Sequence, residues 1–123
     1  HFVGEISCPP IKEEDLIILG SGSGTTKSLI VMGEKAKGVG ARIATVTMFP
    51  EHTIGQMADV IVTVPGSTLK KAEGEKNLAE SVQPMGNLFE QMSWLVYDST
   101  IMVLMDELHQ TSEEMMGRHT NLE

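Results

Sequence analysis

Apolar and polar residues alternate in blocks along the first half of the chain. Leu16–Leu19 is a continuous apolar run between a charged segment and a glycine cluster, a pattern typical of a strand buried on both faces. Residues 28–39 carry apolar side chains at helical spacing with lysines opposite, and glycines follow as stop signals. Residues 43–47 and 60–64 are rich in β-branched side chains and predict two more strands, with a short helix over 54–58 between them.

This succession of strands and helices favours an α/β fold built on a parallel sheet with right-handed crossovers. The 123 residues suffice for one domain, 1–123, or for a piece of one. The chain opens on His1–Val3, which is strand-like and does not begin with Met. We therefore expect that an N-terminal segment of the domain is missing.

The second half of the chain predicts a loop and two helices. Residues 65–80 are polar and show no period, which indicates a long surface loop. Residues 85–108 predict the longest helix, and a last helix over 112–118 is expected to have Ser112 as its cap. The apolar residues of the long helix form two faces, one with Leu88, Met92, Leu95, Ser99, Met102 and Val103, the other with Trp94, Tyr97, Ile101, Leu104, Met105 and Leu108. A helix apolar on two faces is buried on both, so the second face is expected to meet another subunit.

Composition narrows the possible partners. The chain has 9 Lys and Arg against 17 Asp and Glu, a formal net charge of −8. Nucleic acids and anionic membranes are held by clustered Lys and Arg, so we expect neither as a partner. The single cysteine, Cys8, fits a reducing compartment, and no apolar run reaches the roughly 18 residues of a membrane span. A cytoplasmic location is expected.

The sharpest local feature is the loop Gly20–Thr26, seven small residues between a predicted strand and a predicted helix. Such a loop lets the backbone approach a ligand, and the free amides of the helix start suit a phosphate dianion. Thr25 occupies the position where a dinucleotide-binding fingerprint needs glycine, and Lys27 is not preceded by the glycine of a Walker loop, so both of those motifs are rejected. A flexible turn without a ligand explains the loop about equally well.

Few residues offer acid–base chemistry. Glu90 lies near the start of the long helix, where an acid is favoured structurally, but its apolar neighbours would desolvate it and suit it to act as a base. His119, near the chain end, is either a proton donor or a solvated residue, and its terminal position favours the second. His52 and His109 are expected at the surface. The spacing of His, Cys and carboxylates resembles no metal site, so no metal is expected.

Together these segments resemble the sugar isomerase (SIS) domain and, within it, the 6-phospho-3-hexuloisomerases. The loop Ser21–Thr26 matches the Ser-x-Ser-Gly-x-Thr phosphate loop of the domain. The motifs typical of the hexuloisomerase branch are Gly4-Glu5 before Pro9-Pro10, Pro50–Gly55, Pro65–Ser67, Gln83–Gln91 and Arg118–Glu123. The resemblance covers essentially the whole chain in the right order. Thr25, Asn87 and Thr120 depart from the residues common in the family, and the family's N-terminal helical region and first strand are not in this chain.

The resemblance implies a flavodoxin-like, three-layer αβα sandwich that interconverts 3-hexulose 6-phosphate and fructose 6-phosphate without a cofactor. By motif, Ser21, Ser23 and Thr26 would hold the phosphate with the backbone of Gly22 and Gly24. Glu90 would be the base, and His119 would assist from a neighbouring subunit in a tetramer. Three rival interpretations remain: a phosphosugar-sensing regulatory domain, an aldose–ketose isomerase for another sugar phosphate, and a doubly wound nucleotide or flavin protein.

Overall fold

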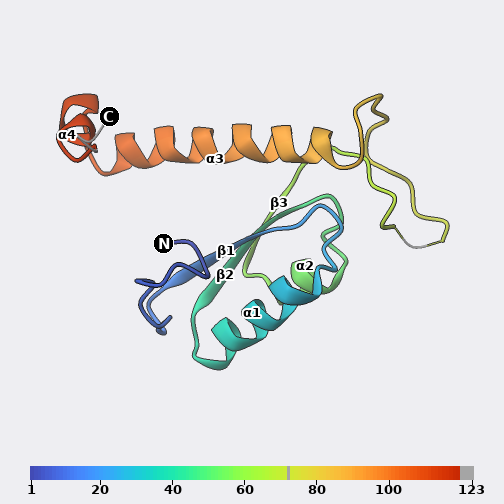
Figure 1. Cartoon of the computed structure of the whole chain (residues 1–123), viewed down its shortest axis with the longest axis horizontal. Helices are drawn as coiled ribbons and strands as arrows, with labels where there is room; N and C mark the ends of the chain where they lie inside the picture. Colours follow the sequence, from blue (N-terminus) through green and yellow to red (C-terminus); the bar gives the residue numbers. More distant parts are fainter. Residues whose placement is uncertain (72, 120–123) are drawn as a thin grey trace.

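The computed structural model describes residues 1–71 and 73–119, which are organised around a small parallel sheet. Strands β1 (Leu16–Gly20), β2 (Arg42–Thr47) and β3 (Val60–Thr63) lie in the order β1-β2-β3 (Figure 1). Leu16 pairs with Arg42, and Ala44 pairs with Val60. The helices are α1 (Lys27–Gly38), α2 (Thr53–Met57), α3 (Asn87–Glu107) and α4 (Ser112–Met116).

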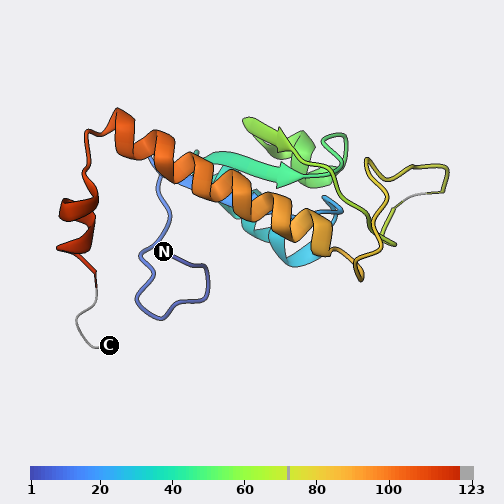
Figure 2. The ribbon, with the colours of Figure 1, turned by 90° about the horizontal axis from the view of Figure 1, so that it is seen from above.

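Helices cover both faces of the sheet, so the domain has three layers (Figures 1 and 2). Helices α1 and α2 pack on one face around a core of Leu19, Ala36, Ala41, Ile43 and Ile54. Helix α3 crosses the other face, where the buried core consists of Val46, Met48, Phe49, Val64 and Phe89. Odd and even residues of β2 enter different cores because successive side chains of a strand point to opposite faces. The predicted αβα fold with a parallel sheet is confirmed.

The elements predicted between residues 16 and 108 are confirmed, with ends that differ by one or two residues. The long helix begins at Asn87 rather than Met85 because Met85 has a φ of 53°, a left-handed conformation outside the helix. The segment 65–80 contains no helix or strand in its described residues, 65–71 and 73–80, as predicted for a loop.

Two predictions near the ends of the chain are wrong. His1–Val3 is not a strand, because the first residues form turns in which Glu5 donates to the Phe2 carbonyl at 3.1 Å. The cap of the last helix is Thr111, not Ser112. The extended backbone of Thr111 lets its hydroxyl accept from the Glu114 amide at 3.2 Å, while the Glu114 carboxylate accepts from the Thr111 amide at 2.8 Å. This reciprocal pair is a capping box.

Strand β1 is less buried than its apolar sequence predicts. Ile17 and Leu19 pack towards α1, whereas Leu16 and Ile18 are 56% and 53% exposed. The expectation of burial on both faces is therefore wrong for β1. The core beneath α3 includes Val46 of β2 but no residue of β1, and Tyr97 of α3 lies beside Gly20 at the end of β1.

Helix α3 contacts the sheet through a single stripe in its first half. The side chains of this stripe are Phe89, Met92, Ser93, Val96 and Tyr97. The two predicted faces are wrong, since the stripe takes Met92 from one and Tyr97 from the other. Other large apolar side chains of the helix are exposed, namely Trp94 and Met102, each at 70%, and Leu95, Ile101, Val103 and Leu104. Within residues 1–71 and 73–119, none of the helices is both long and apolar enough to span a membrane.

Candidate functional site

The Gly20–Thr26 loop connects the carboxyl end of β1 to the N-terminus of α1. Its first half continues the sheet: the Ser21 amide donates to the Val46 carbonyl at 3.0 Å, and the Met48 amide donates to the Gly22 carbonyl at 3.2 Å. Ser21 and Ser23 are consequently buried, at 4% and 8% exposure. The loop is thus held by the sheet at the edge where parallel α/β domains bind ligands.

Hydroxyl groups close the loop on itself. The hydroxyls of Ser21 and Thr26 are 2.9 Å apart, and the Gly24 amide donates to the Ser21 hydroxyl at 3.1 Å. The Ser23 hydroxyl accepts from the Thr25 hydroxyl at 3.2 Å and from its amide at 3.4 Å. Because Ser23 accepts in both bonds, its own hydroxyl hydrogen can point towards a ligand.

The positive end of the α1 helix dipole lies at the end of the loop. Thr26 is the N-cap, but its side chain makes no capping bond, and the first turn contains no acidic residue. The first amides of this 12-residue helix therefore point out of the helix end, where they and the helix dipole favour an anion. The loop and the start of α1 thus offer backbone amides and hydroxyl groups to an anion, and the phosphate site stays a prediction.

Two glycines of the loop lie where a side chain does not fit. A Cβ at Gly22 would lie 3.1 Å from both Met48 and Phe89. Gly24 has a φ of +64°, and a Cβ there would lie 2.9 Å from the Cβ of His52. The loop therefore packs tightly between the sheet, α3 and the turn that precedes α2.

We predict that Gly24→Ala destabilises the domain by about 1–3 kcal/mol, because it adds a close contact to a left-handed backbone. Thermal unfolding would measure the loss. Gly4→Ala is the matched control, since Gly4 also has a positive φ, +100°, but has no atom within 4 Å of the Cβ position. Equal losses in the two variants would contradict a tightly packed loop.

Phe89 brings the start of α3 to the loop. Its ring packs against Gly22, and its Cβ lies 3.0 Å from the Cβ position of Gly66. Glu90 is the next residue, in the first turn of α3, with its amide bonded to the Gly86 carbonyl at 3.1 Å. Its side chain is exposed. The expected desolvation of Glu90 is wrong, because one residue turns the helix by about 100° and only Phe89 faces the core.

Helix α4 follows the end of α3 that is opposite the loop, and His119 comes three residues after α4 in the chain (Figure 2). It is exposed, and its amide bonds to the Met116 carbonyl at 3.0 Å. From Glu90 to Glu107, the last residue of α3, the helix is about 25 Å long at about 1.5 Å per residue. A single chain thus does not bring Glu90 and His119 together. The remainder of the predicted Arg118–Glu123 motif, residues 120–123, lies outside the described residues.

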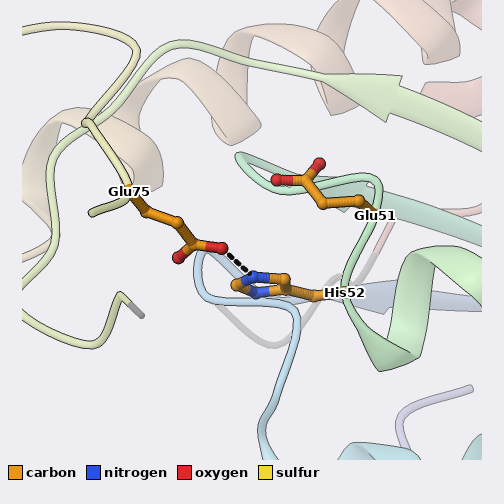
Figure 3. A group of neighbouring side chains, drawn as sticks. All are labelled: Glu51, His52 and Glu75. Carbon is orange, nitrogen blue, oxygen red and sulfur yellow. Dashed lines mark hydrogen bonds and ion pairs between the residues drawn. The ribbon is translucent and has the colours of Figure 1, made fainter. Parts of the chain in front are cut away.

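His52 is not the surface residue that its loop position predicts. Its side chain is only 15% exposed, its Nδ1 lies 2.7 Å from the Ser23 carbonyl oxygen, and its Nε2 lies 2.6 Å from Oε1 of Glu75 (Figure 3). With Glu51 it forms a group of three possible metal ligands whose atoms lie within 4.8 Å of one another. Sequence spacing did not indicate this group, because Glu75 comes from the 65–80 loop.

The chain belongs to the SIS domain family, because the family model described as SIS domain matches residues 5–105. Over its whole length the chain is 47% identical to the 3-hexulose-6-phosphate isomerase of Bacillus subtilis and 35% identical to that of Mycobacterium gastri, covering 65% and 60% of them. It superimposes with a TM-score of 0.81 on a Methanococcus jannaschii protein with an inferred function of 3-hexulose-6-phosphate isomerase. That protein is 30% identical, and all of this chain covers 63% of it. The chain spans less than two thirds of these relatives.

Proposed function

We propose that this chain is the SIS domain of a 6-phospho-3-hexuloisomerase, which interconverts D-arabino-3-hexulose 6-phosphate and D-fructose 6-phosphate. The observation that carries the proposal is the contact of Phe89 with Gly22, which places the start of α3, and Glu90 with it, beside the phosphate loop. Two relatives that match the entire chain and are named 3-hexulose-6-phosphate isomerase support the choice of substrate.

In the proposed mechanism the loop holds the phosphate and α3 supplies the base. Ser21, Ser23 and Thr26, with the backbone of Gly22 and Gly24, bind the phosphate far from the reacting carbons and so orient the sugar. Glu90 removes the proton from C2, next to the C3 ketone, and an enediolate forms. Glu90 returns the proton to C3, while a proton moves from the C2 oxygen to the C3 oxygen. In this mechanism bound substrate covers the exposed side chain of Glu90.

The proposal extends to the assembly. The exposed apolar residues of α3, among them Trp94, Leu95 and Met102, favour a homo-oligomer, and a 410 Å³ hollow lies along the helix between Met92 and Val103. We place His119 in the site of a neighbouring chain, where it assists proton exchange at the oxygens, and the assembly is a tetramer. The single cysteine and the proposed metabolic role support a cytoplasmic location and a role in the ribulose monophosphate pathway of formaldehyde fixation.

Incubation of the intact protein with fructose 6-phosphate tests the proposal, with the products followed by NMR. We expect signals of the 3-hexulose 6-phosphate to grow to equilibrium. Binding of fructose 6-phosphate without conversion would favour a phosphosugar sensor, and conversion of a pentose or heptose phosphate instead would favour a different aldose–ketose isomerase. A bound chromophore in the absorbance spectrum would favour the flavin alternative.

A further inference from the structure

His52 lies between two segments that are far apart in the sequence. One ring nitrogen bonds to the Ser23 carbonyl of the phosphate loop at 2.7 Å, and the other bonds to Glu75 of the 65–80 loop at 2.6 Å (Figure 3). The ring also stacks on Phe49, with centroids 4.9 Å apart and planes 17° apart. The side chains of His52 and Glu75 are only 15% and 24% exposed. The ring is thus held on three sides.

Both bonds of His52 require the charged ring. A carbonyl oxygen and a carboxylate only accept, and a neutral imidazole has a single N–H, so only the imidazolium donates in both directions. The Ser23 carbonyl raises the pKa of His52 above its ordinary 6.5, burial opposes this, and Glu75 and the charge of Glu51 raise the pKa further. Among the described residues, Glu51 from the turn of His52 itself and Glu75 from the 65–80 loop are the charged groups that act on the ring.

The distance between His52 and Glu75 is that of a hydrogen bond rather than that of two ligands of one metal ion. Two ligands of a tetrahedral zinc, each about 2.0–2.1 Å from the metal, are about 3.3 Å apart. The 2.6 Å between His52 and Glu75 is instead that of a short, charge-assisted hydrogen bond. Glu51, the third possible ligand, is exposed.

The contact with Ser23 acts directly on the phosphate loop. The Ser23 carbonyl belongs to the same rigid peptide unit as the Gly24 amide, which donates to the Ser21 hydroxyl and carbonyl at 3.1 and 3.2 Å. Fixing that carbonyl therefore fixes the plane of this peptide. The loop Gly20–Thr26 itself contains no Lys or Arg. His52 is thus placed to set both the shape of the loop and the charge beside it.

We propose that His52 is a positioning residue of the phosphate site: it holds the loop through the Ser23 carbonyl, and Glu75 locks the 65–80 loop onto it. Sugar phosphate binding is then coupled to the docking of the 65–80 loop. This inference rests on the proposed function, because it takes Gly20–Thr26 as the phosphate loop.

His52→Asn and Glu75→Gln, made in the intact protein, test the proposal. Asn retains a donor near the Ser23 carbonyl but loses the charge and the reach to Glu75, whereas Gln retains a hydrogen bond without charge. We expect each variant to raise the KM for fructose 6-phosphate about tenfold, with kcat changed less than about threefold, since losing either a charge-assisted hydrogen bond or its charge is worth a factor of this order. Glu73→Gln is the control, an exposed acid of the same loop that should leave KM unchanged.

The dependence on pH separates this role from a merely structural one. Because the pKa of His52 is raised in the folded protein, its bonds are fully present below about pH 6.5 and are lost as the pH rises through the raised value. The substrate phosphate, with a second pKa of about 6, is almost wholly dianionic above about pH 7.5. The KM of the wild type should therefore rise relative to that of His52→Asn as the pH increases through the raised pKa of His52, because both enzymes share the titration of the substrate phosphate.

The possible outcomes distinguish the inference from the proposed function. If the wild type isomerises fructose 6-phosphate but both variants keep its KM and pH profile, the role of His52 is wrong and the function stands. If the wild type does not isomerise fructose 6-phosphate, the proposed function is wrong, whatever the variants show. A KM that a chelator raises and Zn²⁺ restores would overturn the proton-based account in favour of a metal. If His52→Asn does not fold, the KM of Glu75→Gln still tests the proposal, because Glu75 lies in a loop.

Discussion

Glu90→Gln should lower the exchange of the C3 proton of fructose 6-phosphate by about 10²–10⁴-fold, the usual contribution of a positioned general base. Gln has nearly the same shape as Glu but cannot accept the proton. Binding should change little, because the proposed mechanism assigns the phosphate to the loop and not to Glu90. NMR in heavy water measures the exchange, and titration calorimetry measures the dissociation constant for fructose 6-phosphate.

Glu107→Gln is the matched control for this prediction. Glu107 is an exposed acid at the other end of the same helix, so its replacement changes net charge equally without touching the site. Exchange at the wild-type rate in Glu90→Gln would remove Glu90 from the mechanism. A parallel loss of binding and exchange would instead make it a binding residue.

Ser21→Ala and Ser23→Ala should each weaken the binding of fructose 6-phosphate about 10–100-fold, because each would remove the hydrogen bond to a charged phosphate that the proposed site assigns to it. Both side chains are buried in the loop, and Ser21 also accepts the Gly24 amide. The affinity of the double variant for fructose 6-phosphate should fall by less than the product of the two single factors, since both residues belong to one hydrogen-bond network. Titration calorimetry checks all three variants.

Ser7→Ala serves as the control for the loop variants, because Ser7 is an exposed serine of the N-terminal segment. Unchanged affinity for fructose 6-phosphate in Ser21→Ala and Ser23→Ala would mean that the phosphate binds at another site. Reduced affinity accompanied by a large loss of thermal stability would indicate that the hydroxyls mainly hold the loop.

The sequence predicts the sheet and its connections well because these depend on local patterns. Strands β1, β2 and β3 are short runs of apolar and β-branched residues, and the glycines after β1 and α1 mark where each element ends. The position of the Gly20–Thr26 loop follows from the same signals, because its place between a strand and a helix is local. Ser21 and Ser23 of this loop are buried, and their role in binding a phosphate stays a prediction.

The features that the sequence did not predict depend on contacts over longer distances. Helix α3 is apolar around most of its circumference, so its periodicity cannot select the stripe that faces the sheet. Thr111 and Ser112 are adjacent hydroxyl residues, and only the backbone conformation decides which one caps α4. His52 and Glu75 are 23 residues apart and meet because the 65–80 loop returns to the phosphate loop, which no spacing rule reveals.

The most direct test of the central claim is deuterium incorporation, followed by NMR in heavy water, when the intact protein is incubated with fructose 6-phosphate. The proposed proton transfer predicts deuterium at C3 of fructose 6-phosphate and at C2 of the 3-hexulose 6-phosphate formed from it. The same measurement on residues 1–123 alone shows whether this chain contains the whole site. Fructose 6-phosphate that binds to the intact protein but gains no deuterium would contradict the isomerase and leave a phosphosugar-binding domain.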